Sequence, residues 1–180
     1  IQFFIAGLHI WLMVIIGLTA AFGGVGAYFI FPHVAKRVDN FLDPKKHENY
    51  QVEKSLEAYY NGGLFGQGPG EGVVKGYLPD SHTDFIFAVA GEEFGAILCA
   101  AVILCIAGIV ARGLLRTRQS DKIFTIYAGA GLIMYIAFQA ICNIGVTLHL
   151  LPTKGMTLPF ISYGGSATLA FSMAAGIYLC

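Results

Sequence analysis

The sequence predicts an all-α polytopic membrane protein with about four transmembrane helices, because its composition and its long apolar runs both fit a bilayer. Of the 180 residues, 56% are hydrophobic and only 12% are charged, whereas soluble domains carry roughly a quarter charged residues. The formal net charge is zero, so nothing in the composition indicates nucleic-acid binding. The chain begins and ends inside apolar sequence, and we therefore expect it to be a fragment of a longer membrane protein.

Four apolar stretches are expected to form the membrane spans, with approximate bounds 8–31, 84–111, 123–151 and 164–180. A helix needs about 20 apolar residues to cross a bilayer, and the first three stretches meet that length. The fourth is barely long enough and is expected to be cut short. Pro32 is expected to end the first span, because proline does not continue a helix. The loops between the spans would then cover residues 32–83, 112–122 and 152–163.

The loop expected at residues 32–83 is long enough to be either functional or disordered. We expect a short helix around residues 50–60, followed by a glycine-rich stretch at residues 62–76. Aromatic residues throughout this region favour a packed surface over a floppy linker. The stretch GQGPG at residues 66–70 is only a weak match to a nucleotide-binding fingerprint, because no strand precedes it and no helix follows directly.

Asp84 stands where the polar loop passes into the second apolar stretch. A carboxylate at the edge of the hydrocarbon is costly to desolvate, and ionisable groups at membrane depth are functional candidates. The alternative is that Asp84 only stabilises the start of a helix through the macrodipole. Glu92 and Glu93 would point away from Asp84 on a regular helix, and we expect at least one of them to pair inside the bundle.

The last loop carries a single lysine, Lys154, within LPTKGMTLPFISYGGS at residues 151–166. Its prolines forbid continuous helix, and non-helical backbone at membrane depth survives only against protein or a water-filled cavity. Because successive spans alternate sides, Lys154 and Asp84 are expected on the same side of the membrane, although the Lys and Arg distribution leaves open which side. Lys154 is then either an anion ligand near Asp84 or an interfacial lysine that reaches toward water.

The third span carries a polar stripe, formed by Gln139, Asn143 and Thr147 at intervals of four residues on one helix face. Such side chains either hydrogen-bond to neighbouring helices or contact a substrate. We expect hydrogen bonds within the bundle.

Five motifs together resemble the SEDS (shape, elongation, division and sporulation) family of membrane proteins, the FtsW/RodA family. They are FLDP at residues 41–44, GGLFGQGPGEG at 62–72, YLPDSHTDFIFAVAGEEFG at 77–95, NIGV at 143–146 and LPTKGMTLPFISYGGS at 151–166. Their order and spacing are closest to the division-type (FtsW) branch. The resemblance implies a fold of roughly ten spans of about 20 residues each, of which this chain would be the C-terminal part. It also implies that the loops 32–83 and 152–163 are extracytoplasmic and that the loop 112–122 is cytoplasmic.

The resemblance further implies a peptidoglycan glycosyltransferase that polymerises lipid II in septal cell-wall synthesis, located in the bacterial cytoplasmic membrane. Asp84 of the HTDF motif would be catalytic, and Lys154 of the LPTKG motif would bind substrate. Arg37 would be a second substrate-binding cation, in a region less basic here than in the family. No residue is expected to be a metal ligand, although a divalent cation (Mg²⁺ or Mn²⁺) could assist.

Lipid II, membrane lipid, a class B penicillin-binding protein and other division proteins are the partners that the resemblance implies. A lipid II flippase and a non-catalytic division scaffold are the alternative functions. The isolated 180-residue chain is expected to be inactive, because the remaining spans of the fold lie outside it.

Overall fold

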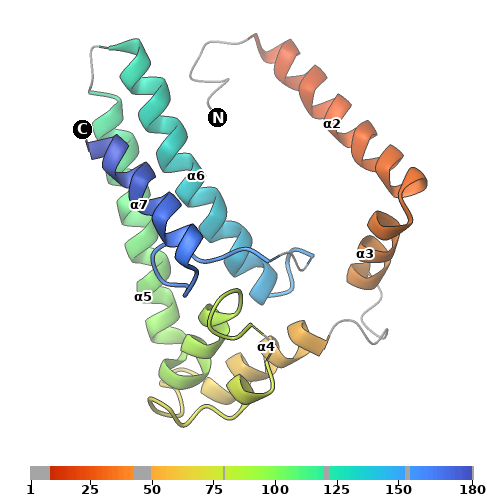
Figure 1. The fold of residues 1–180 in the computed structure, drawn as a ribbon, viewed down its shortest axis with the longest axis vertical. Helices are drawn as coiled ribbons and strands as arrows, with labels where there is room; N and C mark the ends of the chain where they lie inside the picture. The colour runs from red at the N-terminus through yellow and green to blue at the C-terminus, as the bar shows by residue number, and fades with distance from the viewer. Residues whose placement is uncertain (1–8, 43–49, 79, 120–121, 153–154, 180) are drawn as a thin grey trace. The chain divides into compact units, whose positions relative to one another are not determined.

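The computed structural model describes residues 9–42, 50–78, 80–119, 122–152 and 155–179, and every regular element in these ranges is a helix (Figure 1). The all-α prediction is therefore confirmed for the described part of the chain. Contacts divide the chain into two units, Ile1–Asn49 and Tyr50–Cys180. Among the described residues, three helices are long and apolar enough to cross a membrane, Ile10–Ile30, Ile86–Thr117 and Ile123–Thr147.

The first unit contains two consecutive helices, α2 (Ile10–Ile30) and α3 (Pro32–Leu42). Phe31 between them is extended, so α2 ends just before the proline. Residues 32–42, which the sequence places in a loop, instead form a helix at once, because the fixed φ of proline suits the first position of a helix. Tyr28 Oη donates a hydrogen bond to Asp39 Oδ1 at 3.0 Å and links the two helices.

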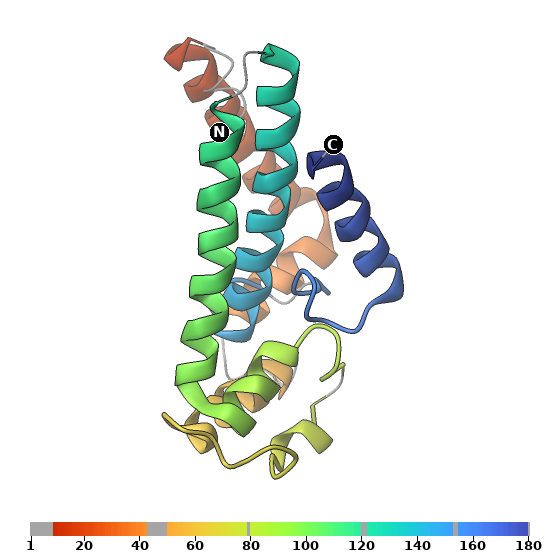
Figure 2. The same ribbon diagram turned by 90° about the vertical axis from the view of Figure 1, so that its left-hand side faces the viewer.

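The second unit is built around two helices, α5 (Ile86–Thr117) and α6 (Ile123–Thr147), which lie side by side and run in opposite directions (Figure 1 and Figure 2). The helices approach closely at Gly113, where a Cβ would lie 2.7 Å from Ile133 Cδ1. The helix α7 (Gly165–Leu179) has 15 residues, fewer than a straight span needs. It packs against α6, where the ring centroids of Tyr135 and Phe171 are 5.6 Å apart.

The bounds of α5 and α6 differ from the expected spans. Helix α5 begins at Ile86 and continues to Thr117 instead of ending at 111, so Arg112 and Arg116 lie on the helix. Long arginine side chains allow this, because their stems can cover apolar surface while the charge reaches water. Helix α6 ends at Thr147 instead of 151, and the following residues turn back so that the N–H groups of 150 and 151 donate to the carbonyl of 145.

The helix α4 (Tyr50–Gly62) and the short 3₁₀ helix η2 (Val74–Gly76) precede α5. The helix expected around residues 50–60 is thus confirmed. Its buried face is tied to the end of α6, where Ser55 Oγ donates to Thr147 O at 2.7 Å and Tyr59 Oη donates to Thr147 Oγ1 at 3.0 Å.

Helix α5 is broken at Gly95, whose φ of 80° and ψ of −179° are not helical. The glycine-rich loop after α4 pairs with the backbone groups on both sides of the break. The four bonds run from Gln67 N to Glu92 O (3.0 Å), Gly68 N to Glu93 O (3.0 Å), Ala96 N to Gly63 O (2.9 Å) and Ile97 N to Leu64 O (3.3 Å). Backbone groups at membrane depth require such partners, because lipid offers none.

Glycine is required where the loop crosses the helix. A Cβ at Gly95 would lie 2.4 Å from Leu64 O, and a Cβ at Gly66 would lie 2.2 Å from Glu93 O. Both glycines have positive φ, 80° and 81°, a conformation that residues with a side chain rarely adopt. A regular helix over residues 84–111, as expected from the sequence, is therefore not what forms.

Glu92 and Glu93 bind the same glycine-rich stretch from the helix. Glu92 is fully buried, and its Oε1 accepts hydrogen bonds from Val73 N and Val74 N, each at 2.9 Å. Glu93 Oε1 lies 2.6 Å from Lys75 Nζ. The expected pairing is thus confirmed for both glutamates. The geometry behind that expectation is different, because Asp84 precedes α5 and does not share its helical rotation.

We expect Gly95→Ala to lower the free energy of unfolding by about 2 kcal/mol or more, because the added Cβ meets loop backbone and the positive φ becomes strained. The measurement is thermal unfolding of the purified protein in detergent. The matched control is Gly108→Ala on the same helix, where no atom lies within 4 Å of the added Cβ, and it should be neutral or slightly stabilising. Equal destabilisation by both substitutions would contradict a specific role for the break.

Candidate functional site

The site begins with the turn that carries Asp84, immediately before α5. The N–H groups of Thr83 and Asp84 donate to Asp80 O at 3.0 and 3.1 Å, so the turn is closed by its own backbone. Asp80 adopts a φ of 55°, which aspartate tolerates better than most residues. The side chain of Asp84 is half-buried, as expected for a carboxylate where a polar loop meets an apolar helix.

The segment 155–163 is bound to this turn by backbone and side-chain hydrogen bonds. Ser162 Oγ donates to Thr83 O at 2.6 Å and accepts from Leu158 N at 2.7 Å. Tyr163 N donates to His82 O at 3.0 Å. Two stretches about eighty residues apart in sequence therefore form one structure, as expected from their placement on the same side of the spans.

Asn143 on α6 joins the two stretches a second time. Its Nδ2 donates to Asp84 O at 2.8 Å and to Met156 O at 2.5 Å. Asn143 is almost completely buried, so the two carbonyls it satisfies would otherwise lack a partner away from water. Helix α6 thus fixes both the backbone of Asp84 and the backbone of the loop that follows Lys154 in sequence.

The Asp84 carboxylate lies directly over Gly155. A Cβ at Gly155 would be 3.0 Å from Asp84 Oδ2, so only glycine leaves the carboxylate its present room. Lys154, the preceding residue, lies outside the described residues, and its predicted role as a substrate ligand stays a prediction. Arg37 belongs to α3 in the other unit, and its side chain also lies outside the described residues.

Two causes raise the pKa of Asp84 above its ordinary value. Burial is the larger, because it penalises the charged form, and the nearby negative charge of Asp80 adds to it. A carboxylate with a raised pKa is a stronger base than an exposed one. The arrangement therefore suits Asp84 to accept a proton.

The polar stripe on α6 has mainly the structural role expected. Asn143 and Thr147 hydrogen-bond to other elements, so the prediction is confirmed for these two residues. Gln139 Oε1 is buried and has no hydrogen-bond partner among the described residues. Tyr59 is one of the loop aromatics that were expected to pack, and its contact with Thr147 agrees with that expectation, whereas no role was predicted for Ser162. Ser162 is one of few hydroxyls within a short apolar segment, which is the only signal that could have indicated its role.

We expect Ser162→Ala to destabilise the protein by about 1–3 kcal/mol, because the change leaves the buried Leu158 N and Thr83 O without their hydroxyl partner. Thermal unfolding of the purified protein is the measurement. Ser166→Ala is the matched control, since Ser166 is exposed at the start of α7, and its effect should stay within about 0.5 kcal/mol. If the two variants unfold alike, Ser162 does not join the two loops.

Comparison with known proteins identifies relatives along the whole chain. The profile of the FtsW/RodA/SpoVE family, described as cell cycle protein, matches residues 1–180. A probable peptidoglycan glycosyltransferase FtsW from Caulobacter vibrioides is 47% identical over 179 residues, which cover 98% of this chain and 45% of the relative. The protein of the same name from Coxiella burnetii is 40% identical, with 98% and 49% covered. Stage V sporulation protein E from Bacillus subtilis is 37% identical, with 99% and 50% covered.

A solved structure of a peptidoglycan synthase complex, described as coordinating polymerization and crosslinking, contains a chain with the same fold. Its TM-score to this chain is 0.77 at 25% identity, and the match covers 99% of this chain and 50% of that one. The chain spans about half the length of the curated relatives it matches. Because the family profile matches every residue and the relatives share 37–47% identity over nearly the whole chain, this multi-pass membrane protein belongs to the FtsW/RodA/SpoVE family.

Proposed function

We propose that the protein containing this chain is a peptidoglycan glycosyltransferase, which polymerises lipid II into glycan strands during septal cell-wall synthesis. The observation that carries the proposal is the Asp84 carboxylate, held beside the backbone of the LPTKG loop at Gly155. The names of the relatives support the reaction class. The chain supplies about half of such a protein, so the complete active site would include residues outside it.

The reaction requires a base near the hydroxyl of the acceptor sugar and positive charge near the diphosphate leaving group of the donor. The 4-hydroxyl of the acceptor sugar attacks the anomeric carbon of the donor, the new C–O bond forms, and the bond to undecaprenyl diphosphate breaks. The hydroxyl proton passes to the Asp84 carboxylate, a contribution of about 10²–10⁴-fold to such reactions. An α-linked donor then gives a β-linked product by inversion, and no covalent enzyme intermediate is needed.

The leaving diphosphate needs cations rather than a protonated acid, because it departs readily once its charge is stabilised. We assign this role to Lys154, which directly precedes the glycine beneath Asp84, with Arg37 as the second candidate. Lysine and arginine are suited to this role, because their side chains form charge-assisted hydrogen bonds with phosphate oxygens.

A divalent cation is not built into this mechanism. Within the described ranges, no three His, Cys, Asp or Glu side chains converge as a metal ion would require. The described residues therefore do not form a protein cage for Mg²⁺ or Mn²⁺. Mg²⁺ often binds through one or two carboxylates and substrate phosphates, which is the form that assistance by a cation would take.

The proposal extends to location and partners. A septal glycosyltransferase would lie in the bacterial cytoplasmic membrane and work beside an enzyme that cross-links the new strands. The structural neighbour comes from a complex that coordinates polymerization and crosslinking, which supports a class B penicillin-binding protein as partner. Other division proteins would place the pair at the septum.

We expect Asp84→Asn to lower lipid II polymerisation by about 10²–10⁴-fold, because the amide cannot accept the hydroxyl proton. The test gives labelled lipid II to the purified full-length protein and measures glycan strands by gel. Glu71→Gln is the matched control, since Glu71 is an exposed carboxylate of the same loop and should leave polymerisation unchanged.

Two other results would contradict the glycosyltransferase proposal and indicate a different function. Loss of transbilayer lipid II movement in Asp84→Asn, with polymer formation intact, would indicate a flippase. Parent and variant proteins that are equally inactive in both assays, yet still bind division proteins, would indicate a scaffold.

The pH dependence of polymerisation should report the environment of Asp84. Because the active form is the carboxylate and its pKa is raised, activity should fall on acidification at a pH above the ordinary range of aspartate. Asp80→Asn removes the neighbouring charge, so the acid limb should move to lower pH. The measurement is kcat against pH for the parent, Asp80→Asn and Glu71→Gln. An acid limb that stays in place in Asp80→Asn would contradict the assignment of Asp84 as the base.

A further inference from the structure

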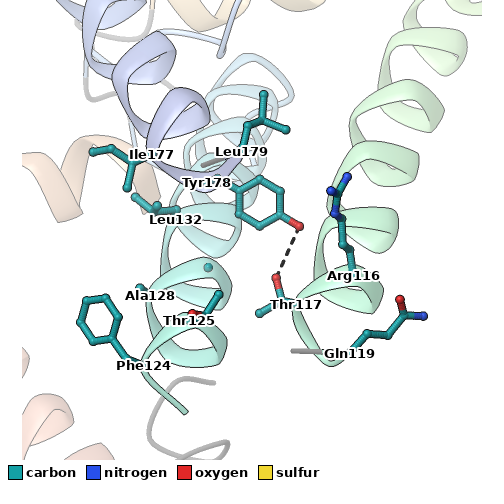
Figure 3. Close-up of a pocket in the computed structure, with 11 residues that line it drawn as sticks. Arg116, Thr117, Gln119, Phe124, Thr125, Ala128, Leu132, Ile177, Tyr178 and Leu179 are labelled. Carbon is teal, nitrogen blue, oxygen red and sulfur yellow. Dashed lines mark hydrogen bonds between the residues drawn. The ribbon is translucent and has the colours of Figure 1, made fainter. Parts of the chain in front are cut away.

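The end of α5 opposite Asp84 carries two arginines that line neighbouring cavities. Arg112 and Arg116 are four residues apart and therefore share one helix face. A cavity of about 520 Å³ lies between the end of α5, the start of α6 and the end of α7, with Arg116 on its wall (Figure 3). A second cavity, of about 290 Å³, includes both arginines in its lining and extends toward the middle of the helices.

The two cavities meet at Tyr178, which lines both. Its hydroxyl donates to Gly113 O at 2.8 Å, and Thr117 Oγ1 lies 3.4 Å from the same hydroxyl, the contact drawn in Figure 3. Tyr178, a residue of α7, thereby links this helix to α5. Its hydroxyl is already bonded within the protein, so Arg112 and Arg116 are the charged groups of the two linings that can bind an anionic ligand.

The cavity linings change from polar to apolar with depth. The larger cavity has Thr117, Gln119 and Thr125 beside Arg116. The second has Ile109, Ile133 and Ile136 beside Arg112. Arg112 precedes the end of α5 at Thr117 by five residues, which is roughly 7–8 Å along a helix. A ligand that filled both would need a charged head and an apolar body.

Neither arginine has an acidic partner within the part of the chain that the structure describes. Among the described residues, no ion pair or hydrogen bond involves the Arg112 or Arg116 side chain. From residue 94 to residue 180, the sequence contains a single acid, Asp121, which lies outside the described residues. Both arginines are exposed beside cavities whose walls also carry isoleucines and leucines. A guanidinium without a carboxylate partner is a strong candidate for binding phosphate, because its planar donors match phosphate oxygens.

We propose that these cavities bind an anionic membrane phospholipid, with its phosphate on Arg116 and Arg112 and acyl carbons along the isoleucines. The apolar lining favours a lipid over free phosphate, which would gain nothing from those walls. The absence of an acid among the described lining residues favours an anionic headgroup over a zwitterionic one. This site lies at the other end of α5 from Asp84 and does not depend on the proposed glycosyltransferase activity.

The test is native mass spectrometry of the full-length protein, released from nanodiscs that contain equal phosphatidylglycerol and phosphatidylcholine. The parent should retain phosphatidylglycerol preferentially. Arg116→Gln should weaken its binding by about tenfold or more, the loss expected for a charged hydrogen-bonded pair. Arg118→Gln is the matched control, because Arg118 is exposed, belongs to the same basic segment and lines neither cavity.

A second variant reduces the volume of the larger cavity and leaves the charge of its lining unchanged. Ala128 lines the larger cavity, and Ala128→Leu should weaken phosphatidylglycerol binding while thermal unfolding verifies that the variant is folded. The proposal would be overturned by equal retention of both lipids, by unchanged binding in Arg116→Gln, or by an equal loss in Arg118→Gln. Displacement of the lipid by millimolar inorganic phosphate would also overturn it, since the cavities would then recognise the anion alone.

Discussion

The exchange of backbone hydrogen bonds at Gly95 is the constraint on which the rest of the second unit depends. A break in a membrane helix exposes N–H and C=O groups that lipid cannot satisfy, so the glycine-rich loop must stay in place for α5 to exist in this form. Glu92 and Glu93 on α5 strengthen the same attachment. Their carboxylates bind Val73 N and the Lys75 side chain, which belong to the next part of the loop. The loop is therefore part of the helix bundle, and the turn with Asp84 starts from a fixed base.

The candidate site is built in the same manner, from backbone groups with buried partners. Asn143 holds the carbonyls of Asp84 and Met156, and Ser162 holds that of Thr83. Such contacts set the position of the Asp84 carboxylate without using the carboxylate itself, so its oxygens stay available for a proton or a substrate. A base that is oriented by its backbone and half-buried by its surroundings combines accurate position with a raised pKa.

Features that depend on residue type and on local position in the chain could be predicted from the sequence. Apolar length predicted three helices long enough to cross a membrane, and the change from polar to apolar sequence correctly placed Asp84 just before α5, while its catalytic role stays a prediction. Sequence reasoning failed where the cause lies in a distant segment. Gly95 was not predicted as a break, because glycine is common in membrane helices and its partners lie some thirty residues earlier in the loop. Helix α3 was missed because Pro32 fits both the end of one helix and the start of the next. The role of Ser162 required knowledge of which loop it meets.

The two ends of α5 thus carry different chemistry. The Asp84 carboxylate lies just before its start, and near its end are Arg112 and Arg116, which have no ion pair among the described residues. The central claim is that Asp84 and Lys154 form one site, and carbodiimide cross-linking of the full-length protein in membranes tests it most directly. Zero-length coupling followed by peptide mass spectrometry should yield an Asp84–Lys154 isopeptide, and the product should be absent in Asp84→Asn. Lys75 and Glu93, whose charged atoms are 2.6 Å apart, provide the internal positive control. Efficient Lys75–Glu93 coupling without any Asp84–Lys154 product would contradict the account.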